Sequence, residues 1–245
     1  MLHYVVEKYF KYPSIPHIFG STPTSDADVM LKSVPKGMFI VYEKLDGANV
    51  GISMANGKIR IQNRGGFLEN KRPHPQWDYL KGYLNSHYDS LLEFFVAFPN
   101  TVVFGEWMYA THTIKYTKLP FYLAVFDYYD MEKGEFVTKQ VKRDLYHSRM
   151  FKGFPGNSLT LQIHNVTDNV WFHPPPIDTT EDVPGYIISN LDTESDYGQF
   201  AEGFIFRDMK DETTVFKYVK REFKDKMSDE HWFNKPLERN KLYNE

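Results

Sequence analysis

Residues 50–61 alternate between apolar and other side chains, and the alternation is interrupted once, by the pair Asn56-Gly57. The apolar positions on its two sides are Val50, Ile52, Met54, Ile59 and Ile61. A period of two places such residues on one face of a strand. Asn-Gly accepts the positive φ of a tight hairpin turn. The sequence therefore predicts an antiparallel hairpin, preceded by an apolar strand over 39–42.

The remaining segments do not follow the regular strand-helix-strand order of a parallel sheet. Further strands are predicted over 101–107, 121–128, 200–207 and 214–220, with a turn at 132–135. Helical spacing predicts one or two helices within 77–98, a helix over 138–150 and a helical tail after 220. The proline-rich residues 151–197 contain one candidate strand, over 159–163, and have no assigned role. This mixture predicts an α+β fold with mainly antiparallel sheets and flanking helices.

Composition narrows the class of protein. The 245 residues are 42% hydrophobic and contain no cysteine, so we expect a single domain over 1–245 without disulfides, thiolate metal sites or a cysteine nucleophile. No apolar run is long enough to span a membrane and no secretory leader is recognisable, so a cytoplasmic or nuclear, non-secreted protein is expected. A net charge of −3 argues against a protein that coats nucleic acid through overall positive charge.

Four separated segments place charged side chains beside a strand-like apolar run. They are Glu43-Lys44-Leu45-Asp46-Gly47-Ala48-Asn49, Phe104-Gly105-Glu106-Trp107, Glu202-Gly203-Phe204-Ile205-Phe206-Arg207 and Val215-Phe216-Lys217-Tyr218-Val219-Lys220. Any one of them alone is most simply explained as a turn or a solvated charge. Taken together and in this order, they indicate one site assembled from distant parts of the chain.

In their order the four segments resemble nucleotidyltransferase motifs I, III, IV and V of the superfamily that contains ATP-dependent DNA ligases, RNA ligases and mRNA capping enzymes. Glu43 and Asn49, which flank the lysine of the first segment, resemble the bacteriophage type-2 RNA ligase branch. Arg64 resembles the motif Ia arginine, and Phe126 the aromatic residue of motif IIIa. The resemblance covers about 40–220 and implies a nucleotidyltransferase (ATP-grasp-like) ligase domain.

The resemblance also implies an activity. RNA ligases of this kind join 5′-phosphate and 3′-hydroxyl ends with ATP and Mg²⁺ or Mn²⁺, through a lysyl-AMP intermediate and an adenylated 5′ end. Lys44 would be the nucleophile, Glu106 would engage the ribose and Glu202 would bind metal, with Glu106 as a second metal candidate. Glu43 would accept a hydrogen bond from the adenine amino group, and Phe126 would stack on the base. Six further residues match positions of the family motifs, and the contacts implied for them are with phosphate, ribose or the lysine. They are Asp46, Asn49, Arg64, Arg207, Lys217 and Lys220.

A lysine must be neutral to attack phosphorus, and only about one in a thousand is neutral near pH 7 at an ordinary pKa of about 10.4. Cations brought near Lys44 would lower its pKa. We therefore expect Lys217, Lys220, Arg207 and a divalent metal to activate it. Strand alternation puts Lys217 and Lys220 on opposite faces, so one of them, preferably Lys217, should reach the phosphate.

Other functions stay open on the sequence. An ATP-dependent DNA ligase, a GTP-specific capping enzyme and a non-ligating nucleotide-binding interaction protein are the alternatives. The twenty-five residues after Lys220 are too few for the oligonucleotide-binding domain that DNA ligases and capping enzymes append, which favours a minimal RNA ligase. Nicked or broken RNA is the expected partner, and an end-healing enzyme is a candidate second partner.

Overall fold

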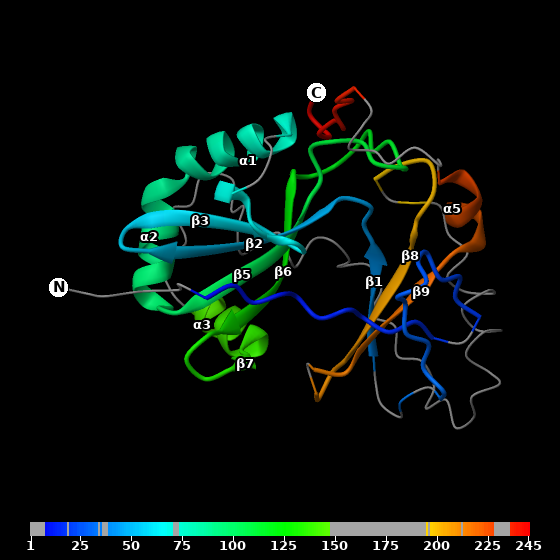
Figure 1. Ribbon diagram of the computed structural model, residues 1–245, viewed down its shortest axis with the longest axis horizontal. Coiled ribbons are helices and arrows are strands. Elements are labelled where there is room, and N and C mark those ends of the chain that lie inside the picture. The colour runs from blue at the N-terminus through cyan, green and yellow to red at the C-terminus, as the bar shows by residue number, and fades with distance from the viewer. Residues whose placement is uncertain are drawn as a thin grey trace.

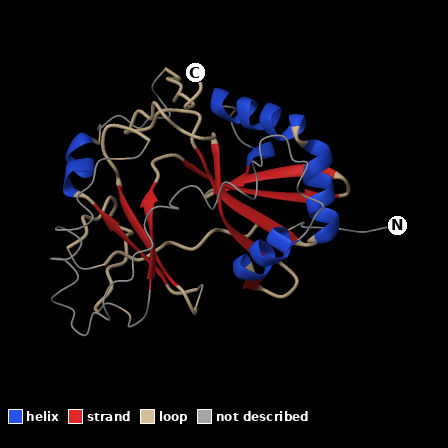
Figure 2. Ribbon diagram, turned by 180° about the vertical axis from the view of Figure 1, so that it is seen from behind, coloured by secondary structure: helices blue, strands red, loops and turns tan. Residues whose placement is uncertain are grey.

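The computed structural model describes residues 8–18, 20–33, 35, 39–70, 74–147, 195, 197–211, 213–227 and 236–245 (Figure 1). Their strands form two antiparallel sheets, one of six strands and one of three. Helices cover the outer face of the larger sheet (Figure 2). The predicted α+β class with mainly antiparallel sheets is confirmed.

The larger sheet has the strand order β4-β3-β2-β5-β6-β7. Its strands are β2 (Ala48–Ala55), β3 (Lys58–Asn63), β4 (Gly66–Phe67), β5 (Thr101–Trp107), β6 (Leu123–Asp130) and β7 (Glu135–Phe136). The predicted hairpin joins β2 to β3, and its turn residues Asn56 and Gly57 have φ angles of 51° and 72°. The adjacent pairing of β2 with β5 brings Asn49 opposite Glu106.

The smaller sheet has the order β1-β8-β9, formed by β1 (Phe39–Lys44), β8 (Gly203–Asp208) and β9 (Val215–Val219). Residues 16–18 of the N-terminal segment lie along the outer edge of β9. Lys217 donates its N–H to the carbonyl of Pro16, and its own carbonyl accepts from Ile18. The edge of the sheet is thereby covered, which removes a template for pairing with another chain.

Helices α1 (Pro75–Ser86), α2 (Tyr88–Ala97) and α3 (Thr138–His147) pack on the larger sheet, and η1 (Leu68–Asn70) follows β4. Pro75 begins α1, where an N–H would have no helical partner. Leu80 and Phe94 contribute to the same buried core as Val50 and Val103. This core holds the larger sheet rigid beneath the site. Among the described residues, no helix is long and apolar enough to cross a membrane.

The tail departs in part from the prediction. Helix α5 (Arg221–Lys226) confirms helix directly after β9, but residues 236–245 are not helical. Asn240, fully buried, donates to the carbonyl of Met108 and accepts from the N–H of Tyr116, so these specific hydrogen bonds outweigh helix formation. The candidate strand over 159–163 and the end of the predicted helix beyond His147 lie outside the described residues.

Candidate active site

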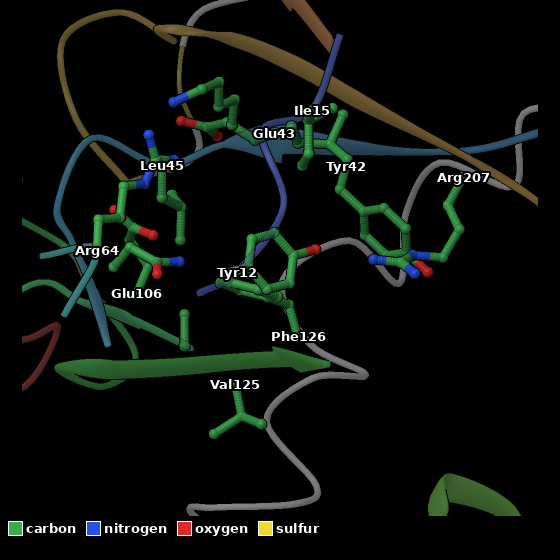
Figure 3. Close-up of a pocket in the computed structure, with 14 residues that line it drawn as sticks. Tyr12, Ile15, Tyr42, Glu43, Leu45, Arg64, Glu106, Val125, Phe126 and Arg207 are labelled. Atoms are coloured by element: carbon green, nitrogen blue, oxygen red, sulfur yellow. The ribbon is translucent and has the colours of Figure 1, made fainter. Parts of the chain in front are cut away.

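A pocket lies between the two sheets, lined by residues of β1, β2, β5, β6 and β8 and by the N-terminal segment. Seven of the residues predicted from the sequence line it: Glu43, Lys44, Asn49, Arg64, Glu106, Phe126 and Arg207. Figure 3 shows Arg64 and Glu106 at one end of the pocket, Arg207 at the other and Tyr12 between them. The fold therefore brings together side chains more than 150 positions apart.

Lys44 is the last residue of β1, and its backbone is paired with Gly203 of β8. The residue before that glycine is Glu202, which lies just outside β8, so its side chain is not bound to the alternation of the strand. Lys44 Nζ lies 2.6 Å from Glu202 Oε1. Only glycine fits at 203, because a Cβ there would come within 1.9 Å of the carbonyl oxygen of Tyr218.

Carboxylates, not cations, dominate the charge around Lys44. Burial lowers its pKa, but Glu202, Glu106 and Asp46 raise it, and the net pKa lies above the ordinary value. The prediction that Lys217, Lys220 and Arg207 lower the pKa of Lys44 is therefore wrong for the described side chains, and the part that concerns a divalent metal stays a prediction. Lys44 is held as a charged ammonium, because the strand register places acidic neighbours closer to it than basic ones.

Glu202 and Glu106 carry the features of a site for a divalent cation. Burial raises the pKa of each carboxyl to about 7, although the charge of Lys44 lowers both pKa values. Glu202 Oε2 is buried and makes no hydrogen bond. Two acidic side chains fit Mg²⁺ or Mn²⁺, which bind oxygen and need few protein ligands when phosphate is present. In the described part of the chain, no group of three or more His, Cys, Asp or Glu side chains could hold a metal ion.

Asp46 has a different position from the one expected of a phosphate or ribose contact. Its carboxylate accepts hydrogen bonds from the N–H groups of Thr113 and Ile114, at 2.7 and 2.8 Å, and it does not line the pocket. Gly47 lets the chain pass this close, since a Cβ would come within 2.8 Å of the carbonyl oxygen of Trp107. Asp46 therefore ties the turn after Lys44 to the loop that follows β5.

Phe126 reaches the pocket because of a β-bulge. Phe104 of β5 is paired with Asp127 and Gly105 with Val125, so Phe126 is an extra residue on β6. A bulge redirects side chains. Phe126 lines the pocket with its ring edge-on to Tyr12 (centroids 5.2 Å apart), whereas Val125 also belongs to the core beneath the helices.

Glu43 lines the same pocket and accepts a hydrogen bond of 2.7 Å from the hydroxyl of Ser195. The Ser195 oxygen accepts from the N–H groups of Tyr197 and Gly198, each at 3.0 Å. A hydroxyl has two lone pairs and one hydrogen, so both lone pairs are used and the hydrogen is directed at Glu43. The orientation of the Glu43 carboxylate is thereby fixed.

Arg207 lies at the pocket but is engaged in a buried bridge between the sheets. Its Nη2 lies 2.8 Å from Asp127 Oδ2, and the Tyr12 hydroxyl donates to the same carboxylate. Arg207 belongs to the smaller sheet, Asp127 to the larger and Tyr12 to the N-terminal segment. The three side chains therefore join all three walls of the pocket.

Lys217 lies within β9, and Lys220 directly follows the strand as the N-cap of α5. Lys217 is buried and its Nζ lies 3.2 Å from Asp28 Oδ1. Lys220 has its Nζ 5.6 Å from the ring centre of Phe204, and its N–H donates to the carbonyl of Glu202. Neither lysine lines the pocket, but Lys217 is close enough to Lys44 for each charge to affect the other.

Sequence reasoning missed the N-terminal segment. Tyr12 and Ile15 line the pocket, and Asp28 contacts Lys217. These residues precede the first recognisable motif, and nothing in their local pattern connects them with it. The aromatic run Tyr9-Phe10-Lys11-Tyr12 was the one available signal, because apolar rings so closely spaced usually pack against a core.

Comparison with known proteins shows the family of the chain. The family model described as RNA ligase matches residues 37–219, more than half of the chain. Solved structures of Naegleria gruberi RNA ligase are similar. One with PPi has 19% identity and a TM-score of 0.49, covering 91% of this chain and 64% of that chain. A mutant with ATP and Mn has 16% identity and a TM-score of 0.45, covering 89% and 63%.

This chain thus spans less than two thirds of the length of those ligases. No curated protein matches it. The family match runs from just before β1 to the end of β9, and so includes every pocket residue predicted from the sequence. On this match the chain belongs to the RNA ligase family.

Proposed function

We propose that this protein is an ATP-dependent RNA ligase that joins 5′-phosphate and 3′-hydroxyl ends, with Lys44 as its nucleophile. The observation that carries the proposal is the position of Lys44, at a pocket with Glu106 and Arg64 and 2.6 Å from Glu202. An amine at the end of a rigid strand, beside acidic and basic side chains, has the arrangement that phosphoryl transfer to a lysine requires.

In the first step, Lys44 releases one ammonium proton to solvent, and the neutral amine attacks the α-phosphorus of ATP. An Nζ–P bond forms, the bond from phosphorus to the bridging oxygen breaks, pyrophosphate leaves and a second proton passes from the nitrogen to solvent. In the second step, a 5′-phosphate oxygen of the RNA attacks the same phosphorus and takes the AMP, which regenerates Lys44. In the third step, the 3′-hydroxyl attacks the adenylated 5′-phosphate and releases AMP.

Charge around Lys44 supports this assignment. Glu202 and Glu106 would hold a divalent metal, which when bound offsets phosphate charge. Arg64 lines the pocket, and Lys217 lies on the Lys44 face of the smaller sheet. We assign these two cations to the phosphates, where they would stabilise the charge that develops as pyrophosphate leaves.

Adenine selection is assigned to Glu43 and Phe126. The Ser195 hydroxyl fixes the Glu43 carboxylate, which as an acceptor favours the amino group of adenine over the carbonyl oxygen of guanine. Phe126, turned toward the pocket by the bulge, supplies a ring for stacking. Asn49, opposite Glu106 in the β2–β5 pair, is assigned to a phosphate contact.

The finer features of the proposal follow the sequence resemblance. We place the chain in the bacteriophage type-2 branch, because Glu43 and Asn49 flank the nucleophile. We further propose that residues 1–245 act as one adenylyltransferase unit on nicked or broken RNA. An end-healing enzyme is proposed as a partner where the RNA ends lack the required phosphate or hydroxyl.

The first test is adduct formation. The purified protein is incubated with α-labelled ATP and Mg²⁺, and label that stays on the denatured protein is measured. We expect labelling that Lys44→Ala abolishes and that Lys58→Ala, an exposed lysine in the β2–β3 hairpin, leaves unchanged. Absence of any adduct in the wild type would refute the proposed function.

The second test is a ligation panel on nicked RNA, nicked DNA and mixed strands, with the 3′-hydroxyl side and the 5′-phosphate side varied separately. RNA on the 3′-hydroxyl side should be sealed best. Preferential sealing of all-DNA nicks would show a DNA ligase instead of an RNA ligase. Labelling of the protein with GTP in place of ATP would show a capping enzyme.

A further inference from the structure

The N-terminal segment, residues 8–31, precedes the residues matched by the family model and runs from one sheet to the other (Figure 1). At the larger sheet, the Tyr9 hydroxyl donates to the carbonyl of Arg64 at 2.7 Å, and Phe10 stacks on Tyr129 with ring centres 3.6 Å apart. At the smaller sheet, residues 16–18 pair with β9. The segment is therefore anchored on both sides of the pocket that it lines.

Asp28 of this segment contacts Lys217 directly. Asp28 Oδ1 lies 3.2 Å from Lys217 Nζ. The other oxygen accepts hydrogen bonds from the N–H groups of Thr24 and Ser25, at 2.8 and 2.9 Å. His17 Nε2 lies 3.3 Å from the same oxygen. One carboxylate oxygen is thus fixed by the local turn, which leaves the second directed at the lysine.

The strand register places this contact on the face of the sheet that carries Lys44. Lys217 is paired with Ile205, which is paired with Tyr42. Tyr42 is two residues before Lys44, and residues two apart in a strand share a face. Tyr42, Ile205 and Lys44 all line the pocket. Lys217 therefore lies on the same face of the smaller sheet as these side chains, and its ammonium contacts Asp28.

The charges that surround Lys217 explain why a carboxylate is needed there. Burial lowers the pKa of Lys217, and the neighbouring cations Lys44, on β1, and Arg64, after β3, lower it further. Asp28 acts in the opposite direction. The remaining titratable neighbour is His17, whose own pKa is lowered by burial and by Lys217. Without Asp28, a buried ammonium would face two other cations.

We propose that Asp28 is a positioning residue for adenylation, which holds the Lys217 ammonium charged and on the Lys44 face of the smaller sheet. The N-terminal segment thereby completes a site whose other residues come from 37–219. This inference rests on the proposed function, because it assigns to Lys217 a contact with the phosphates of the nucleotide. Asp28 itself is given no contact with the substrate.

The test compares the adduct-forming rate of the wild type with that of Asp28→Asn, Asp28→Glu and Asp26→Asn, in single turnovers with α-labelled ATP and Mg²⁺ from pH 6.5 to 9.5. Asp26 is exposed, lies in the same turn and serves as the matched control. A small misplacement of a group at the reacting centre can cost up to about 100-fold in rate. We expect about a tenfold loss at neutral pH in Asp28→Asn, substantial recovery in Asp28→Glu and no change in Asp26→Asn.

The pH profile separates positioning from a merely structural role. Lys217 must be charged, so a lowered pKa moves the alkaline decline of the rate to lower pH in Asp28→Asn. Thermal unfolding of each variant is measured in the same buffers. A uniform loss of rate across the pH range, together with a lower Tm, would show that Asp28 only supports the fold and would overturn the inference.

The wild-type sample distinguishes a failure of this inference from a failure of the proposed function. If the wild type forms the adduct and Asp28→Asn behaves as Asp26→Asn does, the proposed function stands and the positioning role of Asp28 is refuted. If the wild type forms no adduct, both are refuted together.

Discussion

Replacing Arg207 with methionine should destabilise the protein by about 3 kcal/mol. The Arg207 side chain is 11% exposed and that of Asp127 is 2% exposed, with 2.8 Å between Nη2 and Oδ2. Removing one partner of a buried ion pair costs about 3–5 kcal/mol, because the other charge stays buried without compensation. The hydroxyls of Tyr12 and Thr138 still donate to Asp127, which favours the lower end of that range.

The measurement is urea unfolding followed by tryptophan fluorescence, together with the thermal midpoint. A loss of 3 kcal/mol corresponds to a fall in Tm of about 6–12 °C in a protein of this size. Arg221→Met is the matched control. Its side chain is 87% exposed and lies 4.0 Å from Asp225, and an exposed pair contributes at most about 1 kcal/mol.

The double variant Arg207→Met/Asp127→Asn should be less destabilised than the sum of its single variants, because no charge is left buried alone. A loss below about 1 kcal/mol in Arg207→Met would refute the reasoning that Arg207 bridges the sheets. The adenylation rate of Asp127→Asn is a second criterion. If this rate falls as far as the rate of Arg207→Met, Arg207 contributes by bridging the sheets and not by contacting phosphate.

Two further predictions concern stability. Burial raises the pKa of the Glu106 carboxyl to about 7 from an ordinary 4.5. Between these two pH values the folded protein keeps the carboxyl proton, whereas the unfolded chain releases it. The free energy of unfolding therefore falls as pH rises from 4.5 to 7. Glu106→Gln, which cannot ionise, should therefore be more stable than the wild type by on the order of 1–3 kcal/mol at pH 8, and this advantage should vanish near pH 4.5. An equal effect at both pH values in thermal unfolding would contradict it. Asn240→Ala should cost about 2–4 kcal/mol in urea unfolding, because it leaves the carbonyl of Met108 and the N–H of Tyr116 buried without a partner. The exposed Asn244→Ala should change little, and equal effects of the two would count against the buried network.

Local pattern was sufficient to predict most of the strands and helices. The Asn56-Gly57 turn and its flanking alternation define β2 and β3, and β5 coincides with the predicted strand over 101–107. Such elements are determined by neighbours in sequence, because turn geometry and side-chain period are local properties. Short elements such as β4 and β7, of two residues each, carry no periodicity that could reveal them.

The site was predicted in composition but not in all its contacts. The motifs identified seven of the side chains that line the pocket, yet not that Arg207 pairs with Asp127 or that Asp46 holds the loop at 113–114. These contacts depend on how two sheets and a loop pack in space. Pairs 67–80 positions apart in sequence leave no periodic signal, so only the tertiary structure could show them.

Acidic neighbours also determine the charge state in which Lys44, the proposed nucleophile, is held. Glu202, just before β8, lies 2.6 Å from the Lys44 amine, and the β2–β5 pairing sets Glu106, a residue of the same pocket, opposite Asn49. Buried acidic groups raise the pKa of Lys44, and burial raises the pKa of both glutamates. The protonation of each of these three groups therefore depends on that of the other two. The carboxylates that suit a divalent cation are therefore also the groups that raise the pKa of the Lys44 amine.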